Sequence, residues 1–187
     1  IMSQEEESVE LTPATIAERF NTVLFAGETS WMMMTYFGLC FEPETGRITF
    51  CNAGHVPGVL LTTKDGQPKL KSLTSQSNPI GISADTEFKD REISLSPGDR
   101  LIIYTDGLIE GTNRKQKQYG KRRLLKQIQK DAHCDARELT GRIIDHAMDY
   151  FEGVPADDDI TMALIELPPH WKKRTRNTAA VSYTHLT

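Results

Sequence analysis

Leu101-Ile102-Ile103-Tyr104-Thr105-Asp106-Gly107 reads as a buried strand that ends on an acid and a glycine. A second acidic stretch, Asp158-Asp159-Ile160-Thr161, opens another apolar run later in the chain. Each acid therefore lies at a strand end, where the sheet can hold its carboxylate rigidly. Hard divalent cations such as Mg²⁺ and Mn²⁺ prefer oxygen ligands of this kind. Two aspartates make only half of such a site.

The composition describes one globular domain with tails. The chain has 187 residues, 38% of them hydrophobic and 26% charged, which is enough to bury a core. Its net charge of −4 argues against a general nucleic-acid binder, and no apolar run reaches membrane-spanning length. The three cysteines show no CxxC spacing and the five histidines form no close pair. We therefore expect a cytoplasmic protein with buried, reduced thiols and no zinc site; a disulfide between Cys40 and Cys51 across a hairpin is the alternative.

Antiparallel strands joined by tight turns fill the middle of the chain, with helices before and after them. This order predicts an α+β layered domain rather than a parallel βαβ one. The expected helices cover 13–26, 120–131 and 135–152, and the expected strands cover 33–41, 47–51, 59–63, 69–73, 87–95, 100–105 and 160–167. In the first helix Thr12 is the predicted N-cap and Gly27 the predicted stop, and the recurring apolar residues predict one buried face, formed by Ile16, Phe20, Val23 and Leu24.

Two loops contain residue types that suit close-packed turns. Asn52-Ala53-Gly54-His55-Val56-Pro57 combines a permissive glycine with a stiffening proline, and Asn78-Pro79-Ile80-Gly81 is a similar turn that we expect to buttress the first. His55 could act in catalysis, but a lone histidine in a turn is more often structural. The acidic run 157–159 is a solvated loop on the simplest interpretation, although three adjacent like charges favour a compensating cation.

Taken in order, four stretches resemble the SpoIIE/RsbU class of bacterial PPM-type serine phosphatases. They are Asn52–Pro57, Asn78–Gly81, Leu95–Glu110 and Asp158–Thr161. The resemblance extends over residues 12–167, and the four ordered matches make it specific where each alone is not.

The resemblance implies an antiparallel β-sandwich flanked by helices, with two Mn²⁺ or Mg²⁺ ions in a cleft at one end. In that class a metal-bridging water attacks the phosphoserine phosphorus directly, because the metals lower the pKa of the water and neutralise phosphoryl charge. Asp106 and Asp158 would be metal ligands. Asp159, Gly107, Asn52, Gly54 and His55 would orient the metal ligands or hold the fold around them.

The same resemblance implies partners. The substrate would be a phosphorylated anti-anti-sigma (STAS) protein or a similar regulator. A sensory or receiver module would lie upstream, coupled to metal occupancy through the helix at 13–26. A homodimer is an open alternative. So is a parent protein that is anchored to a membrane through upstream segments. No nucleic acid is expected.

The chain also departs from the family pattern. The Gly-Asp-x-x-Asp and Asp-x-x-Gly-His-Gly motifs, which supply the other metal-binding carboxylates in the family, do not occur. We expect residues 1–11 to end a truncated upstream segment and 12–167 to form the last two-thirds of the phosphatase domain. Residues 168–187 would be a tail, in which 181–187 resembles a translated sequencing adapter. This fragment alone is then expected to have little activity and to expose apolar surface.

Two other readings stay open. The domain could be a pseudophosphatase that binds a regulatory partner without cleaving it. It could also be an unrelated β-rich domain with one structural Ca²⁺ or Mg²⁺ at Asp106 and Asp158. A basic stretch from Arg114 to Lys130 is a solvated helix face on the simplest reading, or a surface that guides a phosphorylated partner.

Overall fold

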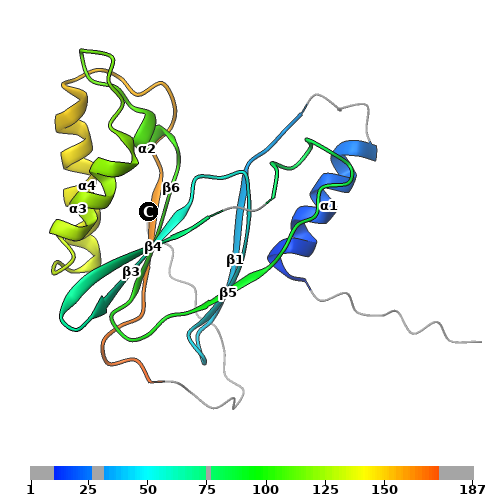
Figure 1. Ribbon diagram of the computed structural model, residues 1–187, viewed down its shortest axis with the longest axis horizontal. Coiled ribbons are helices and arrows are strands. Elements are labelled where there is room, and N and C mark those ends of the chain that lie inside the picture. The colour runs from blue at the N-terminus through cyan, green and yellow to red at the C-terminus, as the bar shows by residue number, and fades with distance from the viewer. Residues whose placement is uncertain (1–10, 27–31, 75–76, 173–187) are drawn as a thin grey trace, which may run out of the picture.

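Two antiparallel sheets form the centre of the molecule in the computed structural model, which describes residues 11–26, 32–74 and 77–172 (Figure 1). The three-stranded sheet has the order β1-β2-β5 and the four-stranded sheet the order β4-β3-β6-β7. The strands are β1 (Tyr36–Glu42), β2 (Arg47–Ala53), β3 (Gly58–Lys64), β4 (Gln67–Leu73), β5 (Arg91–Ser94), β6 (Arg100–Tyr104) and β7 (Met162–Glu166).

The two sheets pack face to face through apolar side chains. Ile48, Phe50 and Ile93 come from the three-stranded sheet, and Leu60 and Leu101 from the four-stranded one. All five are buried. This shared core makes the sheets a sandwich.

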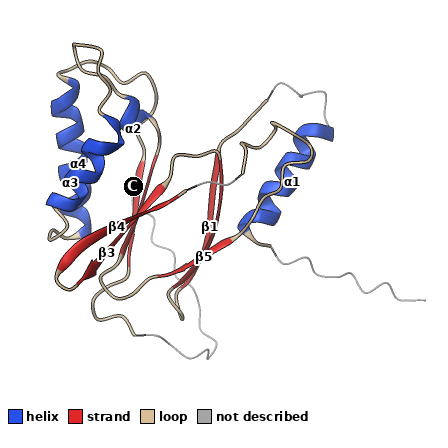
Figure 2. Ribbon diagram, viewed as in Figure 1, coloured by secondary structure: helices blue, strands red, loops and turns tan. Residues whose placement is uncertain are grey.

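Helices cover the outer faces of the sandwich (Figure 2). α3 (Gly120–Lys130) and α4 (Ala136–Phe151) pack on the four-stranded sheet. Their core side chains recur at helical spacing, and the fully buried ones are Leu124, Ile128, Leu139, Ile143 and Ala147. A short helix, α2 (Gly107–Glu110), follows β6 directly and was not predicted from the sequence.

α1 (Pro13–Ala26) packs on β1 and β2 of the three-stranded sheet, with the bounds that the sequence predicted. The cap is also as predicted, because the Thr12 hydroxyl accepts a hydrogen bond from the Thr15 amide at 3.2 Å. The predicted buried face was wrong for two of its four residues, because Ile16 and Leu24 are half-buried and Leu24 packs on the core, whereas Phe20 and Val23 are exposed. Phe20 and Val23 are 47% and 67% exposed, and the buried positions are Pro13, Ala14, Ala17 and Asn21.

The other differences from the predicted elements are local. β1 begins at Tyr36 rather than residue 33, because Met34 pairs only with Ile80 in an isolated bridge. β5 is shorter than the predicted strand 87–95. Gly27 and most of the two predicted tails lie outside the described residues.

The cysteines are free thiols, but Cys40 is exposed, so the expectation that all three are buried was wrong. The β1–β2 register pairs Cys40 with Thr49 and Cys51 with Gly38, so the two thiols are not opposite each other. In the described part of the chain, no helix has the length and apolar character needed to cross a membrane. The α+β sandwich with flanking helices agrees with the predicted fold class.

Candidate metal site

The two acidic segments lie side by side at one end of the four-stranded sheet. β6 and β7 pair until Tyr104 faces Met162, and the chain beyond this pair carries Asp106 on one side and Asp158 on the other. The Thr105 amide donates to the Thr161 carbonyl at 3.0 Å, which extends the pairing past the last strand residues.

The Thr105 hydroxyl ties the segments together a second time. It donates to the Asp159 carbonyl at 2.8 Å and accepts from the Thr161 amide at 2.9 Å. One hydroxyl thus holds the backbone on both sides of Ile160. The sequence analysis did not single out Thr105, and its only signal was a threonine in each acidic stretch.

Asp106 is the N-cap of α2. Its side chain accepts from the Gly107 amide at 3.1 Å, and its carbonyl accepts from Ile109 and Glu110 at 2.8 Å each. The carboxylate is half-buried and is the acceptor that a helix start favours. These bonds hold Asp106 in place, with its second carboxylate oxygen as the candidate metal ligand.

Gly107 has no room for a side chain. A Cβ there would lie 2.7 Å from the Asp159 carbonyl oxygen and 2.9 Å from that of Asp158. The absence of a side chain therefore lets the start of α2 touch the second acidic segment. The sequence singled out Gly107 for this kind of close turn.

Asp158 and Asp159 are exposed. The Asp158 side chain accepts from the Asp159 amide at 2.7 Å, and neither carboxylate forms an ion pair within the described ranges. Asp157 extends the exposed acidic run. Their negative charge is therefore not neutralised by any lysine or arginine that the structure describes.

The Asn52–Pro57 loop reaches the same end of the sheet, because β3 follows it and Val59 pairs with Ile102. The buried Asn52 side chain donates to the Leu73 carbonyl at 3.4 Å and accepts from the His55 amide at 3.0 Å. The His55 ring contacts the Val56 carbonyl through Nδ1 at 2.8 Å and lies edge-on to Phe37. The contacts of His55 are thus with its own loop and with β1.

The second turn packs against the first, as the sequence predicted. Gly54 has a φ of 72°, and a Cβ at this position would lie 2.4 Å from Cγ of Pro79. Parallel bridges join Tyr36 to Gly54 and Ala53 to Ser77. Asn52 and Gly54 therefore shape the loop, and a supporting role for them around bound metal ions stays a prediction.

The donors at this end suit a hard divalent ion, but they do not complete a site. Asp106 and Asp158 supply carboxylate oxygens, the ligands that Mg²⁺ and Mn²⁺ prefer. Within residues 11–26, 32–74 and 77–172, no group of three or more His, Cys, Asp or Glu side chains is arranged to hold an ion. The described residues thus fit as part of a ligand set and not as the whole of a two-metal centre.

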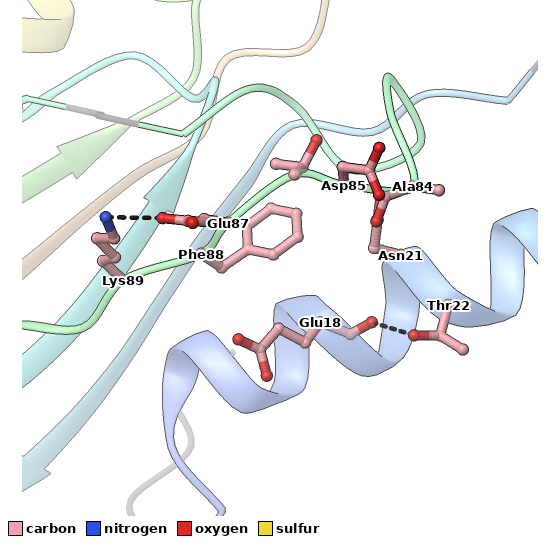
Figure 3. Close-up of a pocket in the computed structure, with 9 residues that line it drawn as sticks. Glu18, Asn21, Thr22, Ala84, Asp85, Glu87, Phe88 and Lys89 are labelled. Carbon is pink, nitrogen blue, oxygen red and sulfur yellow. Dashed lines mark hydrogen bonds and ion pairs between the residues drawn. The ribbon is translucent and has the colours of Figure 1, made fainter.

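A separate hollow of about 460 Å³ lies between α1 and the segment before β5, far along the chain from both acids (Figure 3). It is lined by Glu18, Asn21, Thr22 and residues 84–89. The Asn21 side chain points from α1 to this segment. Its Nδ2 donates to the Ser83 carbonyl at 3.0 Å, and its Oδ1 accepts from the Gly81 amide at 2.8 Å. The hollow is wide open and contains none of the predicted site residues.

Comparison with known proteins places this arrangement in a family. Protein IcfG of Synechocystis sp. is 26% identical over 140 residues, which is 74% of this chain and 21% of the relative. Phosphoserine phosphatase RsbU of Bacillus subtilis is 24% identical over 154 residues, which is 82% of this chain and 44% of the relative. The chain thus spans less than half the length of either relative.

Solved structures share the fold. The SiaA-PP2C domain of Pseudomonas aeruginosa matches with a TM-score of 0.70 at 19% identity, over 83% of this chain and 61% of that one. The phosphatase domain of the cell fate determinant SpoIIE from Bacillus subtilis matches with a TM-score of 0.55 at 15% identity, over 91% and 70%. The family model for Stage II sporulation protein E (SpoIIE) matches residues 1–168, and the chain therefore belongs to the SpoIIE family.

Proposed function

We propose that this chain is part of a metal-dependent protein serine phosphatase that hydrolyses a phosphoserine on a bacterial regulatory partner of the anti-anti-sigma (STAS) type. Family membership and the phosphatase relatives support the reaction class. The observation that carries the proposal is the joining of the Asp106 and Asp158 segments through Thr105 and Gly107. A structural turn alone does not require two unneutralised acids in adjacent segments.

Asp106 and Asp158 would hold Mn²⁺ or Mg²⁺ together with carboxylates that lie outside the described set. Bound there, such ions supply Lewis acidity to a water and to the phosphoryl oxygens. The residues of this chain hold and orient the two acids. The α2 start orients the Asp106 carboxylate, Thr105 fixes the backbone that presents Asp158, and Asp159 adds negative charge beside it.

The test uses the protein encoded by the complete source gene, assayed with Mn²⁺ on a phosphoserine-containing STAS protein. We expect Asp106→Asn and Asp158→Asn each to lower kcat by at least about a hundredfold, more than loss of an outer-shell partner costs. Asp65→Asn is the matched control, because Asp65 is an exposed acid in the β3–β4 turn with a φ of 52°, which asparagine tolerates. A nearly full rate in either site variant would remove the ligand assignment.

A second candidate is a pseudophosphatase that binds the phosphorylated partner without cleaving it. It needs the same fold and the same joined acidic segments, but no complete set of metal ligands. The same purified protein distinguishes the two, because a pseudophosphatase would bind the phosphorylated STAS protein in a pull-down and leave its phosphate in place. Mn²⁺-dependent release of phosphate would exclude it.

A further inference from the structure

Positive charge is concentrated in one segment of an acidic protein. Residues 114–130 contain eight of the 22 lysines and arginines and no Asp or Glu, although the whole chain has a net charge of −4. The segment runs from the loop after α2 to the end of α3. Such an asymmetry creates a local positive potential that the net charge does not reveal.

α3 buries apolar side chains against the fold and exposes basic ones. Leu124 and Ile128 are fully buried against the four-stranded sheet and α4. Arg122, Lys126 and Lys130 follow one another at a spacing of four residues, and all three are exposed. On an α-helix this spacing puts them on one face, as a stripe that runs the length of α3.

The loop before α3 adds more cations to the stripe and is ordered by its own bonds. The Asn113 side chain accepts from the amides of Lys115 and Lys117 at 3.0 and 3.1 Å. The Tyr150 hydroxyl donates to the Lys117 carbonyl at 3.1 Å, which attaches the loop to α4. Lys115 and Lys117 are therefore exposed on a fixed backbone.

Two of the arginines are used inside the fold. The Arg114 side chain donates to the Glu152 carbonyl at 3.1 Å. The Arg123 guanidinium lies 4.4 Å from the centre of the Tyr150 ring and donates to the Tyr119 carbonyl at 2.8 Å. The side chains of the other six cations form no hydrogen bond or ring contact with residues 11–26, 32–74 or 77–172. Among the residues that the structure describes, none of the eight forms an ion pair with a carboxylate.

The surface begins beside the candidate metal site. α2 starts at Asp106 and packs against α3, and the loop that carries Lys115 and Lys117 connects these helices (Figure 1). Arg114 also contacts Glu152, a few residues before the acidic run 157–159. A macromolecule on α3 would therefore extend to the end of the sheet where Asp106 and Asp158 lie.

We propose that Lys115, Lys117, Arg122, Lys126 and Lys130 form a docking surface for an acidic patch on the phosphoprotein substrate. The inference rests on the proposed function and adds a substrate property, since the phosphoserine would have to lie near acidic residues. A protein patch fits better than a nucleic acid. The stripe is one short helix long, and a continuous polyanion leaving it at the α2 end would meet the unneutralised acids 157–159.

Binding measurements on the 187-residue chain test this surface independently of catalysis. Phosphorylated α-casein, an acidic phosphoserine protein, is the probe, and dephosphorylated α-casein and a single-stranded RNA oligonucleotide are the comparisons. The test variant combines Lys115→Gln, Arg122→Gln, Lys126→Gln and Lys130→Gln. The control combines Arg19→Gln, Lys64→Gln, Lys69→Gln and Lys71→Gln, which removes the same charge from exposed positions on other elements.

We expect the Kd for phosphorylated casein to rise at least about tenfold in the test variant and less than about twofold in the control. Raising NaCl from about 50 to about 300 mM should weaken casein binding by the unaltered chain and reduce the difference in Kd between the test and control variants. Equal loss in both variants, or no binding by the unaltered chain, would overturn the proposal. Tighter binding of the RNA, lost in the test variant alone, would also overturn it and identify the surface as a nucleic-acid site.

A small substrate separates this inference from the proposed function. The complete gene product should hydrolyse p-nitrophenyl phosphate at the same rate with and without the four substitutions of the test variant, because that substrate is too small to reach the basic side chains they replace. If the protein hydrolyses p-nitrophenyl phosphate but the test variant binds casein as the unaltered chain does, the proposed phosphatase activity stands and the docking surface is wrong. If the test variant selectively loses casein binding but the protein hydrolyses nothing, the docking surface stands and the proposed activity is wrong.

Discussion

Gly107 shows how one missing side chain shapes the candidate site. Thr105 ties the two acidic segments together by hydrogen bonds, but the close approach itself depends on Gly107. The pattern Asp106-Gly107 predicted a close turn because glycine has no Cβ. It did not predict which backbone makes the approach, since that partner lies far away along the chain.

Replacement of Gly107 by alanine should force the two acidic segments apart. The new Cβ would meet backbone oxygens rather than a flexible side chain, so we expect the free energy of unfolding to fall by about 1–3 kcal/mol. Gly141→Ala is the control, because this α4 glycine has nothing within 4 Å of its Cβ position and should gain up to about 1 kcal/mol. Urea denaturation measures both. A neutral Gly107→Ala would mean that the segments are not in contact.

The first helix shows where helical periodicity is an unreliable guide to burial. α1 buries its small residues Ala14 and Ala17 and the polar Asn21, while its larger Phe20 and Val23 face outward. Small side chains let the helix lie close to β1 and β2. The side-chain amide of Asn21 hydrogen-bonds the neighbouring loop twice, donating to the Ser83 carbonyl and accepting from the Gly81 amide. The sequence pattern weighted size and hydrophobicity, so it assigned Phe20 and Val23 to the buried face instead of Ala14, Ala17 and Asn21, although Ile16 and Leu24 are half-buried.

The corrected face of α1 predicts an inverted pattern of mutational effects. Phe20→Gln with Val23→Gln should change the free energy of unfolding of this chain by no more than about 0.5 kcal/mol, because both side chains are already exposed. Asn21→Ala should cost about 1–3 kcal/mol, since it leaves the Gly81 amide and the Ser83 carbonyl without their partner. Denaturant titration of the variants gives the comparison. A larger loss in the Phe20 and Val23 variant would restore the original prediction.

Across the whole molecule, local signals predicted most elements and a resemblance supplied their arrangement. The β3–β4 turn is an example of the first, since Asp65 and Gly66 have the positive φ that such turns need. The sandwich of two sheets is an example of the second, whereas the pairing of β2 with the short β5 was not predicted, because the chain passes through the other sheet between these two strands. The acids of the candidate site were predictable as strand ends. The Thr105 link and the partial ligand set depend on tertiary contacts.

The pH dependence of stability is a property of the whole fold with a definite sign. Burial, and secondarily the charge of Asp90, raises the pKa of the Cys51 thiol from 9.0 to about 11. Burial raises the pKa of Tyr119 from 10.0 to about 12. Both groups hold their protons more tightly when folded, so the unfolded chain loses protons first as the pH rises. The contribution of Cys51 is therefore complete below pH 9 and is lost on the way to pH 11.

Urea denaturation between about pH 8 and pH 11 should show this fall in the free energy of unfolding, and Cys51→Ala should make the curve flatter in that window. The variant also removes buried volume, so its stability at pH 8 is lower and only the slope is diagnostic. Cys40→Ala, at an exposed thiol, should keep the slope of the unaltered chain. A smaller fall should remain in Cys51→Ala, because burial also raises the pKa of the Cys134 thiol and of the Tyr119 hydroxyl. An unchanged slope in Cys51→Ala would show that the buried thiol does not control alkaline unfolding.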